Sequence, residues 1–325
     1  MSLAALGWTG RHDQDFAAHA GDGLVPGRVV GEHRTHYRVA IDMAELTATP
    51  TGRLRNNALQ RSDLPGVGDF VALRLAADDG PATIEAVLPR TSALVRKAAG
   101  ERRPQLLAAN VDAVFIVTAL DGDFNLQRLG RYLALVHDSG AAPVIVVNKS
   151  DLSSEVAGTI GQIAGMAPGV PIHAISARGQ TGIRELEPYF DGNRTVALVG
   201  SSGVGKSTLT NLLLGHEAQA TGEVRTHDNR GRHTTTHRQL FLRTQGGAIM
   251  DTPGMRGLEL WVTAESIEPD FEDIEAFALE CRFRNCRHSS EPACAVRAAI
   301  ARGDLTAERL ADYAKLGRAA GGGVR

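Results

Sequence analysis

The sequence predicts an α/β domain with a mainly parallel sheet, preceded by a small β-barrel and followed by a helical module with a metal site. Three observations lead to this prediction. Short strand-like segments separated by turn residues fill residues 25–97, continuous apolar runs alternate with helical segments after that, and all three cysteines lie within residues 281–294. Alternation of buried strands with helices is typical of βαβ units, and therefore of a parallel sheet.

The composition allows a sizeable core and gives no sign of membrane contact. The chain has 325 residues, 43% of them hydrophobic, and a formal net charge of -2. No apolar run approaches the roughly 20 residues that a membrane helix needs. The start of the chain lacks the apolar centre of a signal peptide. We therefore expect a cytoplasmic protein, in which any nucleic-acid-binding surface is local.

Four segments are predicted along the chain. Residues 1–24 are small, polar and Gly-rich, so we expect a flexible N-terminal arm. Residues 25–97 carry about five short strands, such as Tyr37–Ile41, which fit an OB-fold, although an SH3-like barrel would look similar. Residues 98–262 form the α/β domain, and residues 263–325 form the C-terminal helical domain.

The α/β domain is predicted from runs that read as buried strands. These runs are Val114–Ala119, Pro143–Val147, Ile172–Ile175 and Thr195–Val199. The helical segments between them are Leu126–Val136, Val156–Ala164 and Ile183–Tyr189.

A phosphate-binding loop follows the last of these strands. The segment Gly200-Ser201-Ser202-Gly203-Val204-Gly205-Lys206-Ser207 fits G-x-x-x-x-G-K-[ST], and a helix is predicted from Thr208, which we include among the nucleotide contacts. Glycines let backbone N–H groups turn inward as an anion nest at a helix N-terminus. Lys206 is predicted to reach the β- and γ-phosphates, and Ser207 to bind Mg²⁺. The phosphate loop alone does not identify the base of the bound nucleotide.

Two further motifs predict that the base is guanine. Asn148-Lys149-Ser150-Asp151 matches N-K-x-D at the end of an apolar strand. The Asp151 carboxylate can accept from the ring N–H and the exocyclic amino group of guanine, a donor pair that adenine lacks. Ser176-Ala177 resembles the backbone-donor motif that contacts the guanine carbonyl. The expected ligands are therefore GTP and GDP.

Two segments after the phosphate loop are predicted to sense the γ-phosphate. Asp251-Thr252-Pro253-Gly254 fits D-x-x-G, in which Asp251 binds Mg²⁺ through water and the Gly254 N–H contacts the γ-phosphate. A threonine of the run 234–236, assigned to Thr236, would bind Mg²⁺ when GTP orders its loop. The predicted catalytic residues are Lys206, Thr236, Asp251 and Gly254.

The motifs occur in circularly permuted order. Ras-like GTPases have the phosphate loop first and the base-reading motifs last, whereas here the motifs at 148 and 176 precede the loop at 200. Strand neighbours need not change, because only surface connections are cut and rejoined. Residues Arg178–Arg194 would join the old ends. The chain leaves the domain just after Gly254. The C-terminal residues are therefore connected directly to the segment that is predicted to sense the γ-phosphate.

The cysteine cluster predicts a structural zinc site. Cys281, Cys286, His288 and Cys294 supply three thiolates and one imidazole, a complete tetrahedral set with no position left for water. Three buried cysteines beside an unrelated surface histidine are the alternative.

Basic residues gather in two places. From residue 281 onward there are nine basic and four acidic residues, which indicates either phosphate-backbone contact or a solvated helical face. Arg53, Arg55 and Arg61 lie in a barrel loop. This loop could face RNA, or it could be exposed to solvent without a binding role.

Together these motifs resemble the ribosome small-subunit-dependent GTPase A family, over about residues 25–315 and including the run Gly231–Thr236. The resemblance implies an OB-fold, a circularly permuted GTPase domain and a zinc domain. It also implies that the protein binds the 30S subunit and its 16S rRNA and assists late subunit maturation, with GTP hydrolysis stimulated by the subunit. We expect a monomer that meets other maturation factors and no membrane.

One residue indicates slow intrinsic hydrolysis. Met255 follows D-x-x-G, where Ras-like enzymes carry the water-orienting glutamine, and a thioether cannot position water by hydrogen bonding. His233 and His237 are candidates for that role, and structural roles or contacts with RNA are the equal alternatives for them. The alternative functions are a nucleotide-gated, zinc-dependent RNA-binding scaffold with little turnover and, less favoured, phosphoryl transfer to a small molecule.

Overall fold

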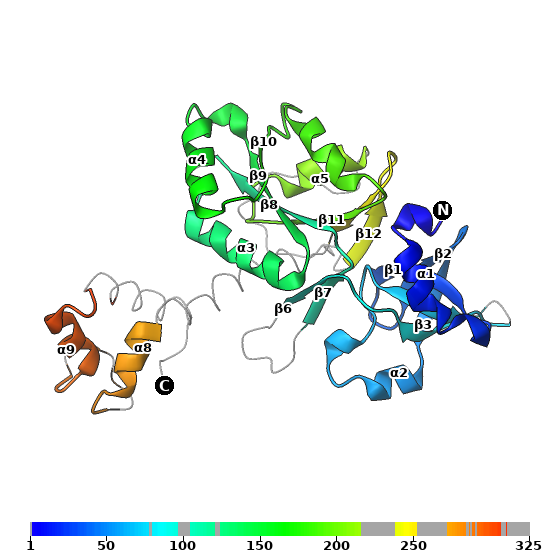
Figure 1. Ribbon diagram of the computed structural model, residues 1–325, viewed down its shortest axis with the longest axis horizontal. Coiled ribbons are helices and arrows are strands. Elements are labelled where there is room, and N and C mark those ends of the chain that lie inside the picture. Colours follow the sequence, from blue (N-terminus) through cyan, green and yellow to red (C-terminus); the bar gives the residue numbers. More distant parts are fainter. Residues whose placement is uncertain are drawn as a thin grey trace, which may run out of the picture. The chain divides into compact units, whose positions relative to one another are not determined.

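The computed structural model describes residues 2–77, 80–96, 105–120, 124–215 and 238–251, and then residues 272–283, 286, 288–289, 291–306 and 310. The chain divides into two compact units, residues 1–259 and 260–325, and each is described by itself (Figure 1). Among the described residues, no helix is long and apolar enough to cross a membrane.

Five strands form a closed barrel in the first unit. They are β1 (Val25–Glu32), β2 (Tyr37–Ile41), β3 (Ala44–Pro50), β4 (Phe70–Arg74) and β5 (Ala82–Val87). Their order is β1-β2-β3-β5-β4, and pairing of β1 with β4 closes the barrel. β3 and β5 run parallel, and the other neighbours run antiparallel. The predicted OB-fold is confirmed. Helix α2 (Gly52–Asn57) and the 3-10 helix η3 (Arg61–Asp63) connect β3 to β4.

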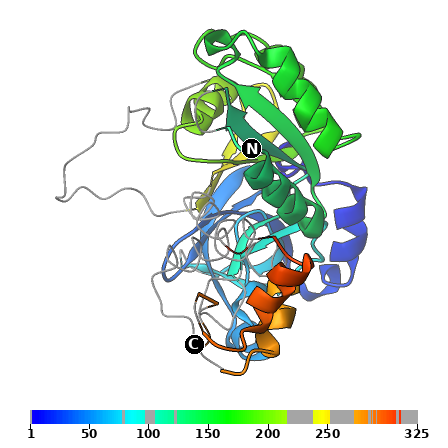
Figure 2. The ribbon, with the colours of Figure 1, turned by 90° about the vertical axis from the view of Figure 1, so that its left-hand side faces the viewer.

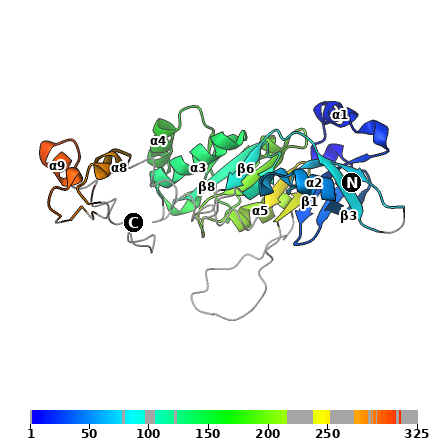
Figure 3. The ribbon, with the colours of Figure 1, turned by 90° about the horizontal axis from the view of Figure 1, so that it is seen from below.

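The segment before the barrel differs from the predicted flexible arm. Two short 3-10 helices, η1 (Ala4–Leu6) and η2 (Ala20–Asp22), flank helix α1 (Gly10–Ala17), which lies against the barrel (Figure 3). Leu6 is fully buried, and the His12 ring lies 4.0 Å from that of Phe70, centroid to centroid. The composition suggested an arm because most residues here are small or polar. A few large side chains nevertheless fix the segment by burying apolar surface.

Six strands form the sheet of the α/β domain. They are β8 (Ala113–Ala119), β9 (Ala142–Asn148), β10 (Ile172–Ala174), β11 (Thr195–Val199), β12 (Arg238–Leu242) and β13 (Ala248–Asp251). Their order is β10-β9-β8-β11-β13-β12, with all strands parallel except β12. β8 to β10 precede β11 in the chain and lie on one side of it, whereas β12 and β13 follow it and lie on the other. This arrangement confirms the circular permutation.

Helices cover both faces of this sheet (Figure 2). Helix α5 (Lys206–Leu214) and the 3-10 helix η5 (Ile183–Phe190) share a core with Phe115 and Val196 on one face. Helix α3 (Leu126–Ser139) packs against β8 and β9, and α4 (Val156–Met166) packs against α3 and β10. η5 lies within the predicted connection between the old chain ends.

The barrel and the α/β sheet are continuous through β1. Gly31 and Glu32 of β1 pair with Gln239 and Arg238 of β12, so that eleven strands form one sheet. A bulge between Val29 and Gly31 shifts the register of β1 against β2. Bulges bend a strand and increase its twist. The start of β1 can therefore pair within the barrel, and its end can pair with β12. A separate hairpin, β6 (Ala93–Arg96) and β7 (Gln105–Ala109), follows the barrel.

The second unit contains α8 (Glu272–Leu279) and α9 (Ala295–Arg302). Its small core consists of Ile274, Cys286, Cys294, Val296, Ala299 and Leu305.

Gly68 allows a close approach between the barrel and the α/β sheet. Its φ is +97°, and a Cβ there would lie 2.0 Å from the Ala109 carbonyl oxygen and 2.7 Å from Cε of Met250 in β13. Gly192 has a similar φ of +70°, but a Cβ there would meet nothing within 4 Å. A substitution at Gly68 therefore introduces both a steric clash and backbone strain, whereas a substitution at Gly192 introduces backbone strain alone.

We predict that Gly68→Ala lowers the free energy of unfolding by about 3 kcal/mol or more, because strain and overpacking add. Gly192→Ala should cost only about 1–2 kcal/mol, from strain alone. Urea unfolding of both variants measures this difference. Equal losses would contradict the close approach.

Candidate nucleotide-binding site and metal centre

The predicted nucleotide motifs meet at one edge of the parallel sheet. The phosphate loop follows β11, Asn148 is the last residue of β9, and Ser176 comes two residues after β10. Asp251 is the last residue of β13, the strand paired with β11. Ligands of open α/β sheets bind outside the carboxyl ends of the strands, where these motifs lie.

The phosphate loop has the backbone of an anion nest. Gly200, Gly203 and Gly205 have positive φ, and α5 begins at Lys206. The Lys206 ammonium donates to the carbonyls of Gly200 and Ser201, which holds it over the loop. Ser202 and Gly203 are exposed, Ser201 and Val204 are buried, and Ser207 and Thr208 are partly exposed in the first turn of α5.

The side chain of Asn148 joins the base-reading motifs to the phosphate loop. Its Nδ2 donates to the Val204 carbonyl at 2.7 Å, and its Oδ1 accepts from the Ala177 N–H at 2.9 Å. The residue is 2% exposed, so water does not compete for either bond. One amide therefore fixes three loops relative to one another. The Ala177 N–H, predicted to contact the guanine carbonyl, donates to Asn148 in this structure.

This contact also explains why residue 205 is a glycine. A Cβ at position 205 would lie 2.3 Å from Asn148 Nδ2, and φ is +96°. The glycine leaves room for the amide that holds the loop.

The two base-reading loops are also joined through their backbones. The Ser150 N–H donates to the Ile175 carbonyl at 3.0 Å, and Lys149 adopts a left-handed φ of 60° that turns the chain after β9. The Ser176 hydroxyl accepts from the Gly179 N–H at 2.9 Å, which closes the second loop. Asp151 lies exposed in the first of these loops. Its carboxylate is accessible to a ligand.

Several predicted residues lie outside the part of the chain that the structure describes. These are Thr236, Gly254 and Met255, together with His233 and His237. Asp251 is placed through its backbone, opposite Gln239 in the β12–β13 ladder.

The predicted zinc ligands come together in the second unit. The ligand atoms of Cys281, Cys286, His288 and Cys294 all lie within 4.8 Å of one another. The Sγ atoms of Cys281 and Cys294 are 3.9 Å apart, and His288 Nδ1 lies 3.6 Å and 3.4 Å from them. Zinc bonds of about 2.0–2.3 Å in a tetrahedron separate ligand atoms by roughly 3.5–3.8 Å. The cluster is compatible with zinc, and His288 is buried beside Cys286 and Cys294 rather than being an unrelated surface residue.

Burial shapes the protonation of this cluster. It lowers the pKa of His288 and so favours the neutral imidazole that binds metal, and it raises the pKa of Cys286 to about 11. Burial also opposes ionisation of Cys281, but hydrogen bonds from the backbone N–H groups of Val296 and Ala295 at the start of α9, together with those from the Cys294 and Cys286 thiols, outweigh it and lower the pKa of that thiol. Helix N-termini favour thiolates in this way.

A groove at one end of the barrel was not predicted. It encloses about 690 Å³ between the β1–β2 loop and the segment that joins β3 to β4. Its basic and aromatic lining residues are His33, Arg34, His36, Tyr37, Arg55 and Arg61. The His33 and His36 rings stack at 4.6 Å. The sequence signal is the run from His33 to Arg38, which contains two histidines, two arginines and a tyrosine around a predicted turn.

Comparison with known proteins identifies the family. Residues 87–261 match the model of the RsgA GTPase family. The chain is 46% identical over 297 residues to small ribosomal subunit biogenesis GTPase RsgA 2 of Lactiplantibacillus plantarum, covering 91% of this chain and 84% of that protein. This chain belongs to the RsgA GTPase family. It is therefore a GTP hydrolase, and its nucleotide is a guanine nucleotide.

Other relatives agree with this assignment. The small ribosomal subunit biogenesis GTPase RsgA of Methanosarcina acetivorans is 43% identical over 311 residues, covering 95% of this chain and 83% of that protein. The structure is similar to the crystal structure of YjeQ from Thermotoga maritima, with a TM-score of 0.56 and 26% identity over 92% of this chain and 99% of the other. It is also similar to YloQ, a circularly permuted GTPase, with a TM-score of 0.53 and 25% identity over 90% of this chain and 93% of the other.

We predict that Asn148→Ala weakens GDP binding at least tenfold. The substitution leaves the Val204 carbonyl and the Ala177 N–H unpaired in a buried site, at about 1–3 kcal/mol for each group, and about 1.4 kcal/mol corresponds to a factor of ten. Calorimetric titration with GDP measures the effect. Asn125→Ala, which removes the N-cap hydrogen bond to Arg128 in α3, is the matched control and should bind GDP normally. Unchanged affinity in Asn148→Ala would refute the bridging role.

Proposed function

We propose that this protein binds the small (30S) ribosomal subunit and assists its late maturation, with slow intrinsic GTP hydrolysis that the subunit stimulates. The observation that carries the proposal is the guanine-nucleotide site joined by Asn148, in a chain that also bears a basic groove on its barrel. Relatives that span most of this chain are named small ribosomal subunit biogenesis GTPases, which supports the choice of partner.

The nucleotide contacts follow from the motifs at the sheet edge. In this proposal Asp151 reads guanine, Asn148, Lys149 and Ser150 support it, and Ser176 and Ala177 border the base. The phosphates are bound by the loop and the first turn of α5, through Gly200, Ser201, Ser202, Gly203, Val204, Gly205, Lys206, Ser207 and Thr208. The exposed N–H groups of an anion nest suit this role.

Magnesium completes the proposed catalytic site. Ser207, Thr236 and Asp251 are the residues that would hold the ion, and Lys206 and the Gly254 N–H would contact the γ-phosphate. Bound Mg²⁺ offsets the charge that develops on the phosphate oxygens. Because Met255 cannot orient water, another group positions the nucleophile, and His233 and His237 remain the candidates.

The barrel groove is proposed to contact 16S rRNA. Arg34, Arg55 and Arg61 supply cations, and Tyr37 and the stacked histidines supply flat surfaces for unpaired bases. The carboxylate of Glu32 lies 3.8 Å from Arg61, so it offsets only part of this charge. Arg53, predicted on the same surface, instead lies 3.9 Å from Glu85.

The second unit is proposed to hold one structural Zn²⁺ through Cys281, Cys286, His288 and Cys294. Its small core includes two of these ligands, so the metal supplies stability that apolar burial does not. Exposed Arg282 and Arg297 are proposed as further basic contacts for rRNA, whereas exposed Arg302 pairs with Asp304 at 3.0 Å.

We further propose a cytoplasmic monomer with domain boundaries at residues 25–97, 98–262 and 263–325, which meets other maturation factors on the subunit. No feature of the residues that the structure describes favours the alternative scaffold without turnover or the phosphoryl-transfer enzyme.

GTP turnover with and without purified small subunits tests the proposed function. We expect at least a tenfold higher rate with the subunit, and no turnover in Lys206→Ala under either condition. Equal rates for the wild-type protein would rule out the coupling. If Lys206→Ala also supported subunit maturation, the scaffold would be the better account.

Zinc removal should affect only the second unit. Chelation, or Cys294→Ser, is expected to increase hydrogen exchange across residues 272–306 and to leave GDP affinity within about twofold, because the sheet does not depend on those ligands. Ser289→Ala, which changes the same loop but no ligand, is the control. Unchanged exchange after verified metal loss would contradict a structural role for the metal.

A further inference from the structure

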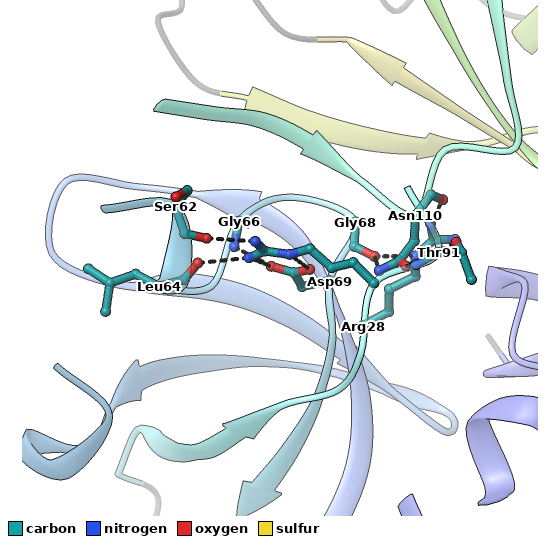
Figure 4. A network of polar contacts seen from close by, with 9 residues as sticks. Arg28, Ser62, Leu64, Gly66, Gly68, Asp69, Thr91 and Asn110 are labelled. Carbon is teal, nitrogen blue, oxygen red and sulfur yellow. Dashed lines mark hydrogen bonds and ion pairs between the residues drawn. The ribbon is translucent and has the colours of Figure 1, made fainter. Parts of the chain in front are cut away.

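Arg28 of barrel strand β1 lies buried between the barrel and the α/β sheet, with 1% of its surface exposed. Its Nε donates to the Gly68 carbonyl at 3.1 Å, and its Nη2 donates to the Asn110 carbonyl at 3.0 Å (Figure 4). Its Nη1 donates to the Thr195 hydroxyl at 2.8 Å and to the Leu6 carbonyl. One side chain therefore contacts four segments that are remote in sequence.

The guanidinium remains charged in this buried position. Burial lowers the pKa of Arg28 to about 10, and the carboxylates of Asp112 and Asp69 oppose the decrease. The cation is also 4.7 Å from the centroid of the Phe70 ring. Only a planar group with several fixed donors can satisfy these acceptors at once, which distinguishes arginine from lysine here.

A second arginine fixes the turn that Arg28 contacts. Arg90 makes two hydrogen bonds of 2.7 Å to the Asp69 carboxylate and donates to the carbonyls of Ser62 and Leu64. Asp69 in turn accepts from the Gly66 N–H at 2.8 Å. The Gly68 carbonyl that accepts from Arg28 therefore belongs to a rigid turn of the barrel.

Thr195 connects this network to the phosphate loop. It is the first residue of β11, and the loop begins directly after the last residue of that strand. Its hydroxyl accepts from Arg28, and its N–H donates to the Asp112 carboxylate at 2.7 Å. The start of the central strand is thus held by the barrel on one side and by the residue before β8 on the other.

Strand β1 also connects the groove to the strands that lead to the D-x-x-G motif. Its last residue and the loop after it, Glu32 to His36, line the barrel groove, and its Gly31 and Glu32 pair with β12. β12 pairs in turn with β13, which ends at Asp251. Strand pairing therefore connects the groove to the strand that ends at Asp251, and Arg28 connects the same strand β1 to β11.

We propose that Arg28 is a positioning residue for stimulated GTP hydrolysis: by fixing β1 to β11, it transmits binding in the barrel groove to the phosphate loop. This inference rests on the proposed function, in which the groove contacts the small subunit. Nucleotide binding itself does not need Arg28, because Asn148 and Lys206 hold the loop locally.

The test compares Arg28→Lys with Arg38→Lys. Arg38 lies on the neighbouring strand β2, outside the groove, where it pairs with Glu45. For Arg28→Lys we expect GDP affinity, intrinsic turnover and the KM for the small subunit to stay within about threefold of wild type, while the stimulated kcat falls at least tenfold. Arg38→Lys should match the wild type in all four measurements.

Thr195→Val provides a second variant in case Arg28→Lys fails to fold. It removes the hydroxyl that accepts from Arg28 but keeps a side chain of similar shape, so the stimulated kcat should fall while GDP affinity is retained. The inference is overturned if the folded variants keep wild-type stimulation. It is also overturned if intrinsic turnover and GDP affinity fall in parallel with the stimulated rate, since that pattern indicates a merely structural role.

The same experiment separates this inference from the proposed function. A wild-type protein that the subunit does not stimulate contradicts the proposed function. Strong stimulation of both wild type and Arg28→Lys contradicts only the role of Arg28.

Discussion

The buried guanidinium of Arg28 needs hydrogen-bond acceptors where water does not reach, and it takes them from the N-terminal segment, the barrel, the connection to β8 and the start of β11. Leaving a buried charge unpaired costs about 3–5 kcal/mol. Loss of any one segment therefore weakens the hold on the others. The barrel and the GTPase sheet should consequently behave as one cooperative unit rather than as two domains on a flexible linker.

The nucleotide site likewise depends on one buried polar side chain, that of Asn148, whose hydrogen bonds hold separate segments together. Circular permutation changed the chain connections between the loops, but the loops are held together by side-chain and backbone hydrogen bonds that do not depend on chain order. Asn148 bonds to residues 56 and 29 positions away. A permuted chain can therefore build the same edge of a parallel sheet, with its new exit beside β13.

Much of this architecture could be predicted from local sequence patterns. Strands such as Val114–Ala119 are continuously apolar because helices cover both faces of the sheet, and the phosphate loop and the cysteine cluster have fixed spacings. β3 was harder to predict, since most of its side chains are exposed or half-buried. The N-terminal helices were missed because few of their side chains are apolar.

The role of Arg28 could not be read from the sequence at all. A single arginine in a strand gives no signal of burial, because its partners lie 40, 82 and 167 residues further along the chain and one lies 22 residues before it. The groove shows the same limit. Its histidines and arginines were visible in the sequence, but only the closed barrel brings the β1–β2 loop beside the segment before β4.

Native-state hydrogen exchange in increasing urea tests the central claim, that the barrel and the GTPase sheet are one cooperative unit. Amide protons in β1, β11 and β13 should become exposed together, with one free energy of opening and one dependence on urea. If the amides of the barrel core, such as those of Val29 and Val71, opened at a clearly lower free energy than those of β11, the barrel would be an independent domain, and this account of Arg28 would be wrong.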